Sequence, residues 1–167
     1  MPEVQVSGST RVRAVGVQGD SRRYPDRPFL GIGALVFRFE NGRREILLVE
    51  RGKEPLKGLW SLPGGILEVG ERLADGIRRE VLEETGLEVE AESVFEIFER
   101  IMPDAEGRPE YHYVLVDYLC HVKGGLLQAA SDVSAAAWVG RDQLRHYRIT
   151  EGTLAVVERA FDNEASS

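Results

Sequence analysis

Hydrophobic positions gather in several short runs along the chain, separated by turn-forming and charged residues, and this spacing is typical of β-strands. Phe29–Phe39 is an aliphatic and aromatic run, and Glu45–Glu50 is a second apolar run. Between them Asn41 and Gly42 form a strong turn signal, so the two runs are predicted to pair as a hairpin. Further strands are predicted over Glu88–Arg100, Tyr111–Cys120 and Ala135–Val139.

Two longer stretches have the three- and four-residue spacing of an amphipathic helix. The first is Glu71–Thr85, which Gly86 ends as a C-terminal cap. The second is Thr150–Phe161 near the end of the chain. Hairpins combined with few substantial helices predict an α+β fold in which helices flank a mixed sheet. The apolar stripe of the first helix consists of Leu73, Ala74, Ile77 and Val81.

The chain is expected to hold one compact domain with two flanking segments. A length of 167 residues, 43% of them hydrophobic and 29% charged, is ordinary for a single globular domain. The domain is predicted over residues 29–161. Residues 1–28 are predicted to be an N-terminal arm or edge strand, with weak alternation at Val12–Val17, and residues 162–167 a frayed tail.

Charge and cysteine content limit the classes of partner. The formal net charge of −7 argues against a nucleic acid polymer, because following a phosphate backbone requires a basic face. The single cysteine, Cys120, excludes an intrachain disulfide and ends an apolar strand, as a buried small hydrophobic residue does. No stretch is long and apolar enough for a signal peptide or a membrane span. We therefore expect a cytoplasmic protein with no membrane partner.

The first helix carries a cluster of carboxylates. Glu80, Glu83 and Glu84 stand at positions i, i+3 and i+4, which places them on one face of the helix. Neighbouring carboxylates repel one another, and a hard divalent cation with oxygen ligands offsets that repulsion. Arg79 can pair with Glu83 one turn away or reach back to Glu71 at the helix entrance. The pattern indicates a site for Mg²⁺ or Mn²⁺, although an acidic helix face can also be simply solvated.

The loop before this helix is Leu62 to Gly65. Together with Glu71, Arg79, Glu80, Glu83, Glu84 and Gly86 it resembles the signature of the Nudix hydrolases. The resemblance implies an α/β/α sandwich in which the loop, helix and loop of this Nudix box lie beside a mixed sheet. It also implies a divalent cation and hydrolysis of a nucleoside diphosphate linked to another moiety.

By motif position, the resemblance implies that Glu80, Glu83 and Glu84 are metal ligands. Glu80 and Glu84 project most nearly together, so they are expected to form the principal pair, with Glu83 as a further ligand or the base. Glu71 is expected to be a peripheral ligand or the partner of the helix arginine. The carbonyl of Gly65 is a possible backbone ligand.

Residues outside the box are candidates for substrate binding. Arg51 and Lys53 lead into the glycine loop, where either can meet a substrate phosphate or be solvated. Tyr111 and Tyr113 can stack on an adenine or pack within the fold.

The general base of many Nudix enzymes lies on a loop that the motif does not locate. Glu106 and Glu110, in and beside the Pro103–Pro109 loop, are the candidates, because a mobile loop can close over substrate. Asp104 and Asp117 are further candidates, and each of the four is more typical of a surface carboxylate than of a base.

The substrate is predicted from one further resemblance. Pro103 lies sixteen residues after Leu87, as a proline does in ADP-ribose pyrophosphatases, so the predicted reaction converts ADP-ribose to AMP and ribose 5-phosphate. Alternatives are a pyrophosphatase that removes damaged (deoxy)nucleoside triphosphates and a Nudix module that binds a nucleotide without cleaving it. Relatives in the ADP-ribose branch often exchange N-terminal strands, so Val12–Val17 suggests a homodimer.

Overall fold

The computed structural model describes residues 20–163. It contains a seven-stranded mixed sheet, two α-helices and a short 3₁₀ helix. The elements are β1 (Phe29–Glu40), β2 (Arg43–Arg51), β3 (Trp60–Ser61), β4 (Gly64–Ile66), α1 (Leu73–Thr85), β5 (Leu87–Pro103), β6 (Pro109–Gly125), β7 (Val133–Gly140), η1 (Arg141–His146) and α2 (Thr153–Asp162).

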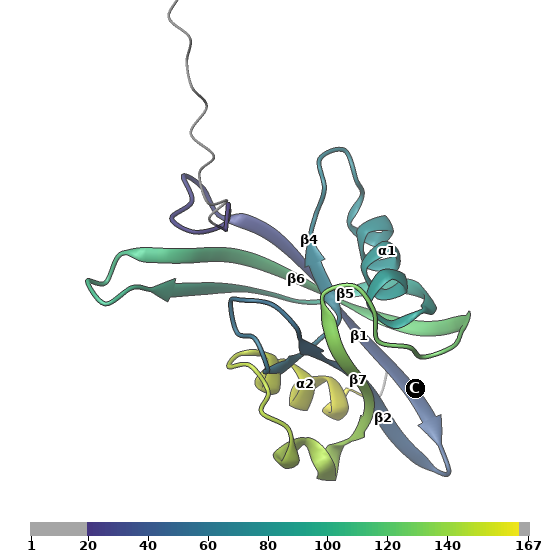
Figure 1. Ribbon diagram of the computed structural model, residues 1–167. Helices are drawn as coiled ribbons and strands as arrows, with labels where there is room; N and C mark the ends of the chain where they lie inside the picture. The colour runs from purple at the N-terminus through teal and green to yellow at the C-terminus, as the bar shows by residue number, and fades with distance from the viewer. Residues whose placement is uncertain (1–19, 164–167) are drawn as a thin grey trace, which may run out of the picture.

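The sheet combines antiparallel hairpins with one parallel pair. Its main path runs β3-β2-β1-β6-β5, while β4 pairs with β1 and β7 with β2 (Figure 1). β1 and β2 form the predicted hairpin around Asn41 and Gly42. β1 and β6 run parallel, with Gly31 opposite Leu115 and Gly33 opposite Asp117. The predicted mixed sheet is therefore confirmed.

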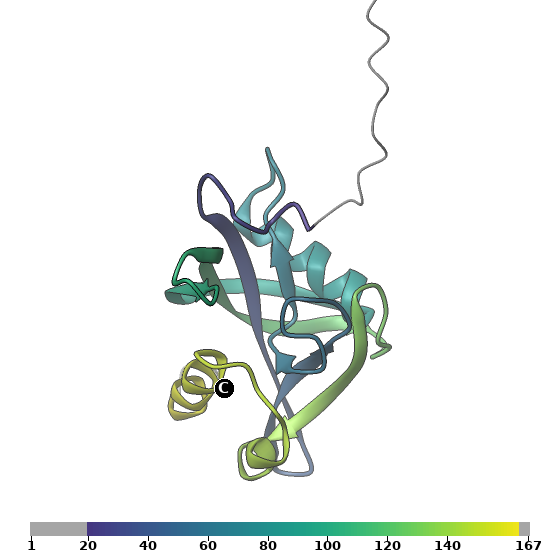
Figure 2. The same ribbon diagram turned by 60° about the vertical axis from the view of Figure 1, so that its left-hand side comes forward.

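The two α-helices cover opposite faces of this sheet (Figure 2). Because side chains alternate along a strand, Leu35 of β1 packs with Val157 of α2, whereas Val36 packs on the other side with Ile77 and Val81 of α1. The result is the expected α/β/α sandwich. It places α1, which carries the carboxylates, against the middle of the sheet.

Some element boundaries differ from the sequence prediction. α1 begins at Leu73 rather than Glu71, because Arg72 has extended backbone angles and is the N-cap. Gly86 ends the helix with φ of 71°, the left-handed conformation that glycine adopts without steric cost. Part of the predicted glycine loop is strand, since Gly64–Ile66 pairs with β1.

The segment before β1 contains turns and no strand over residues 20–28. It lies against the end of β6, where the N–H of Tyr24 donates to the carbonyl of Glu110 at 2.7 Å and Arg23 pairs with the Glu110 side chain. Val12–Val17, the segment predicted as an exchanging strand, lies outside the described residues.

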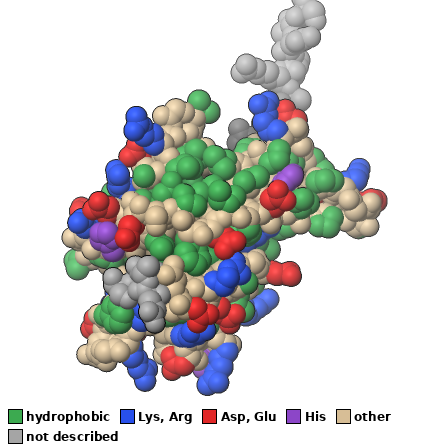
Figure 3. Space-filling model, turned by 180° about the vertical axis from the view of Figure 1, so that it is seen from behind, with side chains coloured by type: hydrophobic (Ala, Val, Ile, Leu, Met, Phe, Trp, Pro, Cys, Tyr) green, Lys and Arg blue, Asp and Glu red, His purple; other side chains and the backbone are tan. Residues whose placement is uncertain are grey.

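Large apolar side chains are exposed on β5 at Val94, Ile97 and Ile101. Figure 3 shows hydrophobic side chains gathered across the face of the molecule seen from behind. Within residues 20–163, neither helix has the length and apolar character needed to cross a bilayer.

Candidate active site

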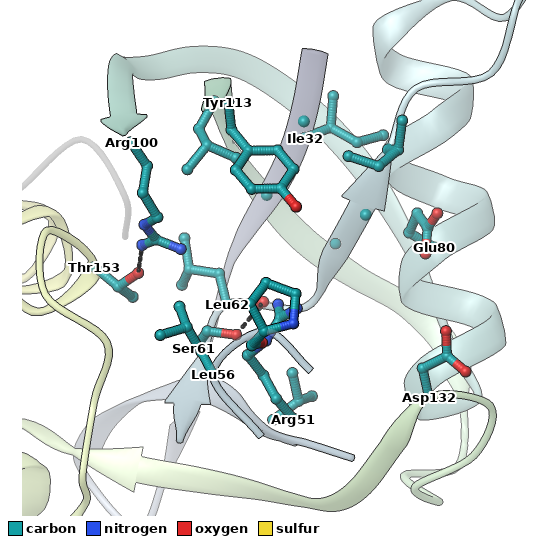
Figure 4. A pocket seen from close by; sticks show the side chains of 18 of the residues that line it. Ile32, Arg51, Leu56, Ser61, Leu62, Glu80, Arg100, Tyr113, Asp132 and Thr153 are labelled. Atoms are coloured by element: carbon teal, nitrogen blue, oxygen red, sulfur yellow. Dashed lines mark hydrogen bonds between the residues drawn. The ribbon is translucent and has the colours of Figure 1, made fainter. Parts of the chain in front are cut away.

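A cavity of about 260 Å³ opens where β1, β4 and β6 meet α1 and the start of α2 (Figure 4). Glycines of β1 and β4 border it, so the backbone can approach a ligand closely there. Charges of both signs share this single cavity, an arrangement suited to a cation and an anionic ligand together. The charged lining residues are Arg22, Arg51, Lys53, Arg100, Glu54, Glu80, Glu84, Asp117 and Asp132.

Glu84 and Glu80 enter this cavity from consecutive turns of α1. Glu84 is 8% exposed, and the N–H of Gly64 donates a hydrogen bond to its Oε2 at 3.0 Å. Burial raises the pKa of Glu84 to about 8, and the negative charge of Glu80 adds to the rise. Burial also raises the pKa of Glu80. For both carboxylates burial therefore outweighs the neighbouring cation, which is Arg79 for Glu80 and Arg51 for Glu84.

Arg79 links the carboxylates of Glu71, Glu80 and Glu83. Its Nε and Nη2 donate to the two oxygens of Glu71 at 2.7 and 3.0 Å, while Nη1 donates to Glu80 at 2.8 Å and to Glu83 at 3.3 Å. The hydrogen bonds from Arg79 lower the pKa of Glu71 to about 2. Both pairings predicted for Arg79 occur, and the guanidinium fixes how these carboxylates are oriented.

Glu83 and Gly65 occupy different places in the site. The side chain of Glu83 is 49% exposed, turns toward Arg79 and does not line the cavity. Gly65 borders the cavity, and a side chain there would collide with the Glu80 carboxylate. The missing side chain of Gly65 thus leaves the space that Glu80 fills.

The predicted phosphate-binding cations Arg51 and Lys53 both line the cavity, and Figure 4 shows Arg51 apart from Glu80 of α1. Arg51 is partly buried and its Nε donates to the carbonyl of Pro55 at 2.9 Å. Lys53 is more exposed and pairs with Asp132. Both side chains line the cavity, as the sequence prediction requires, and each can reach an anionic ligand in it.

The two predicted tyrosines are stacked with each other. Their ring centroids are 6.4 Å apart and their planes differ by 9°. Tyr113 is 7% exposed and lines the cavity, where Figure 4 shows its hydroxyl pointing inward, while Tyr111 does not line it. Tyr113 is therefore the tyrosine available to a ligand, and Tyr111 packs behind it.

Comparison with known protein families identifies this arrangement. A family model described as the NUDIX domain matches residues 29–160. The chain belongs to the Nudix hydrolase family. The family resemblance predicted from the box is confirmed, and the box carboxylates lie on α1 beside the sheet as that resemblance implies.

Curated Nudix relatives carry two kinds of name. An ADP-ribose pyrophosphatase of Methanocaldococcus jannaschii is 34% identical over 100 residues, covering 60% of this chain and 57% of the relative. An 8-oxo-dGDP phosphatase of Homo sapiens is 33% identical over 126 residues, covering 73% and 36%. A putative ADP-ribose pyrophosphatase of Bacillus subtilis is 30% identical over 145 residues, covering 87% and 65%. The chain spans less than two thirds of the length of each of these relatives.

Solved structures agree with the Nudix fold. An ADP-ribose pyrophosphatase from Streptococcus suis superposes with a TM-score of 0.59 at 32% identity, covering 83% of this chain and 95% of that one. The Nudix domain of Shewanella oneidensis NrtR, solved with ADP ribose, has a TM-score of 0.66 at 23% identity and covers 81% and 88%. The second similarity shows the fold alone.

The residues present fit the divalent cation that the Nudix family implies. Glu80 and Glu84 offer oxygen donors, which hard cations prefer, and both are buried enough for their pKa values to rise. Among residues 20–163, no three side chains of the ligating types gather at one point, since Glu83 turns toward Arg79. The chain thus presents a pair of carboxylates to the cavity.

The structure does not bring the candidate bases Glu106 and Glu110 to the cavity. β5 and β6 are each 17 residues long and carry their connecting loop away from α1 (Figure 1). Glu106 lies beside Arg108, and Glu110 pairs with Arg23. Asp104, expected at the surface, has a side chain only 8% exposed and accepts hydrogen bonds within the loop.

Several residues of the cavity were missed by the sequence prediction. Asp117 was expected to be a surface carboxylate, but it is 3% exposed and lines the cavity, so that prediction is wrong. Arg100 of β5 and Arg22 of the N-terminal segment also line it. The sequence signal that could have indicated Asp117 was Gly33, because a glycine within an apolar strand indicates that another group approaches the backbone closely.

Proposed function

We propose that this protein is a metal-dependent pyrophosphohydrolase that cleaves the anhydride bond of a nucleoside diphosphate derivative. The observation that carries the proposal is the meeting of Glu80 and Glu84 with Arg51 and Lys53 around one cavity. A pyrophosphate is anionic along its whole length, so it requires positive charge on both sides. The cavity offers side-chain cations as well as carboxylates for a metal ion.

Each group has a distinct task in this proposal. Glu80 and Glu84 would hold a Mg²⁺ or Mn²⁺ ion, which would supply positive charge for the phosphate oxygens and make a bound water more acidic. Arg51 and Lys53 bind the phosphate oxygens that the metal ion does not. Arg79 holds Glu80 and Glu71 in fixed orientations. Glu83, kept beside Glu80 by the same guanidinium, is a proposed further ligand or base, and Gly65 a proposed backbone ligand.

ADP-ribose is the first proposed substrate, with water splitting it into AMP and ribose 5-phosphate. The names of the relatives from Methanocaldococcus jannaschii, Bacillus subtilis and Streptococcus suis support this choice. Pro103, the proline shared with that branch by position, ends β5. The name of the human relative supports an oxidised guanine nucleotide as a second candidate.

Phosphate release tests the proposal. The full chain is assayed with a coupled phosphatase and Mg²⁺ or Mn²⁺ on ADP-ribose, 8-oxo-dGDP and a panel of nucleoside triphosphates. Glu84→Gln is expected to lower kcat/KM by about 100-fold or more, because the carboxylate is lost while its shape is kept. Glu158→Gln changes an exposed carboxylate on α2 that is not at the cavity, and it should leave turnover unchanged.

Other outcomes separate the alternatives. Full activity of folded Glu84→Gln would remove the box from the reaction. Nucleotide binding without turnover on any substrate would favour the non-catalytic Nudix module. The homodimer remains a prediction, which light scattering of the full chain and of a chain lacking residues 1–24 can check.

A further inference from the structure

The most unusual side chain of the cavity is the carboxylate of Asp117. It lies on β6 opposite Gly33 of β1, and its Oδ1 occupies the space that a side chain at Gly33 would need. The residue is 3% exposed. Within the described residues its Oδ2 is buried without a hydrogen-bond partner. A buried acceptor in this state destabilises the fold unless a donor reaches it.

Neighbouring charges do not neutralise this carboxylate. Arg100 attracts it, but the Nη2 of Arg100 donates to Glu151 O at 3.1 Å and to the hydroxyls of Thr150 and Thr153. Glu96, across the strand pair, repels it. Burial is the dominant effect and raises the pKa of Asp117 to about 7. A ligand that donates a hydrogen bond would therefore find an acceptor already in place.

The surroundings of Asp117 are otherwise apolar and partly aromatic. Leu62, Phe98 and Leu115 also line the cavity. The Cδ1 of Leu62 is 3.5 Å from where a Cβ at Gly33 would lie, beside the Asp117 carboxylate. Small-molecule sites with apolar walls and a few polar groups bind flat, largely apolar groups. The polar groups of such a site form hydrogen bonds with the edge of the bound group. Of the parts of a nucleotide, the base has this character, whereas phosphate and ribose require several polar partners.

We propose that Asp117 recognises the exocyclic amino group of the substrate's nucleobase. A carboxylate accepts hydrogen bonds, so it attracts an amino group and repels a carbonyl oxygen at the same position. The residue thereby selects adenine or guanine against hypoxanthine, which lacks both amino groups. This inference rests on the proposed function, because it assumes that a nucleotide occupies the cavity.

Equilibrium binding tests the recognition without requiring turnover. Binding of AMP, GMP and IMP to the wild-type chain is measured by calorimetry in the presence of Mg²⁺ at pH 8, above the pKa of about 7 at which Asp117 loses its proton. IMP has a carbonyl oxygen where AMP has an amino group, and it lacks the amino group of GMP. At least one amino-bearing nucleotide is expected to bind about tenfold or more tightly than IMP, as a hydrogen bond to a charged group provides.

Two variants assign this preference to Asp117. Asp117→Leu removes the acceptor at similar size and is expected to abolish the preference. Asp117→Asn can turn its amide N–H₂ toward a carbonyl oxygen, so the preference is expected to fall about tenfold or reverse. Asp142→Asn alters an exposed carboxylate that does not line the cavity and should keep it. Circular dichroism confirms that each variant is folded.

The outcomes distinguish this inference from the proposed function. Equal wild-type binding of AMP, GMP and IMP overturns the inference even if no variant folds. A preference that persists in both folded Asp117 variants also overturns it. An Asp117-dependent preference without hydrolysis of any anhydride leaves the recognition standing and removes the proposed activity. Hydrolysis of an anhydride without any preference among AMP, GMP and IMP keeps the proposed activity and removes the recognition by Asp117.

Discussion

The guanidinium of Arg79 holds both carboxylate oxygens of Glu71, at 2.7 Å from Nε and 3.0 Å from Nη2. Glu71 precedes the first residue of α1, whereas Arg79 lies in the middle of that helix. The pair therefore ties the end of the Nudix loop to the helix face that carries Glu80. Such two-point contacts fix orientation as well as distance.

Arg79→Lys tests this orienting role. Lysine keeps the charge but has no planar fork, so it cannot bind Glu71 at two points and Glu80 at the same time. Activity is expected to fall about 10- to 100-fold, with a higher Mg²⁺ concentration at half-maximal activation. The measurement is initial rate against Mg²⁺ concentration on the substrate found in the phosphate-release panel.

Arg78→Lys is the matched control for this variant. Arg78 is the preceding residue, is about half exposed and pairs with Asp75 outside the cavity. The Mg²⁺ concentration that gives half-maximal activation of Arg78→Lys should equal that of the wild type. An Arg79→Lys protein that loses activity at an unchanged Mg²⁺ requirement would show that Arg79 does not act through the metal ligands.

The local part of this site could be predicted from sequence. Helical spacing alone places Glu80 and Glu84 on one face and brings Arg79 within reach of Glu71 and Glu83, because these relations depend on one regular element. The start of α1 was misplaced because the extended backbone of Arg72 follows from the preceding turn and not from periodicity.

The remaining part of the site depends on contacts distant in sequence. Asp117 reaches the cavity because parallel pairing of β1 and β6 sets it opposite Gly33, and no local pattern encodes that register. Glu106 stays outside because β5 and β6 continue as strands beyond the predicted ends and carry their loop away. Candidate residues outside the box were therefore the least predictable.

Gly33→Ala tests the close approach of Asp117 to β1. A methyl group at Gly33 would overlap the Asp117 carboxylate, which is enclosed and cannot move away freely. The free energy of unfolding is expected to fall by about 1–3 kcal/mol, as in other overpacked interiors. Urea denaturation followed by circular dichroism measures the change.

A double variant assigns this loss to the predicted contact. Combining Gly33→Ala with Asp117→Ala removes the carboxylate that the methyl group meets, so the two effects should not add. Gly124→Ala on β6 is the control, because the nearest atom to its added methyl group lies at an ordinary 3.5 Å. If the two losses in the free energy of unfolding add, the methyl group at Gly33 collides with a group other than Asp117.

The thiol of Cys120 is expected to be unreactive in the folded protein. Cys120 is 5% exposed, and burial raises its pKa to about 12, with a smaller contribution from the negative charge of Glu92. The thiolate is the reactive form, so little of it is present at pH 8. Reaction with a disulfide reagent should be slow for the native chain and fast in denaturing urea. Equal rates under both conditions would contradict the buried position.

Stability should depend on pH through Asp117. The pKa of this carboxyl is about 7 in the fold against an ordinary 3.8, because burial outweighs the attraction of Arg100 and Glu96 adds repulsion. Between pH 4 and 7 the folded state then binds more protons at this site than the unfolded state. The free energy of unfolding therefore falls as pH rises through this window, by up to about 4 kcal/mol from this group.

Asp117→Asn isolates this contribution, since it removes the titration while keeping the shape. Denaturant unfolding of both proteins is compared at pH 5 and pH 8 without nucleotide or metal. Other titrating groups, Glu84 among them, contribute to both proteins and cancel in the difference. The variant should gain stability relative to the wild type as pH rises, because only the wild type must bury a charge at pH 8. A difference that does not change with pH would show that Asp117 is ionised throughout and has a donor in the fold.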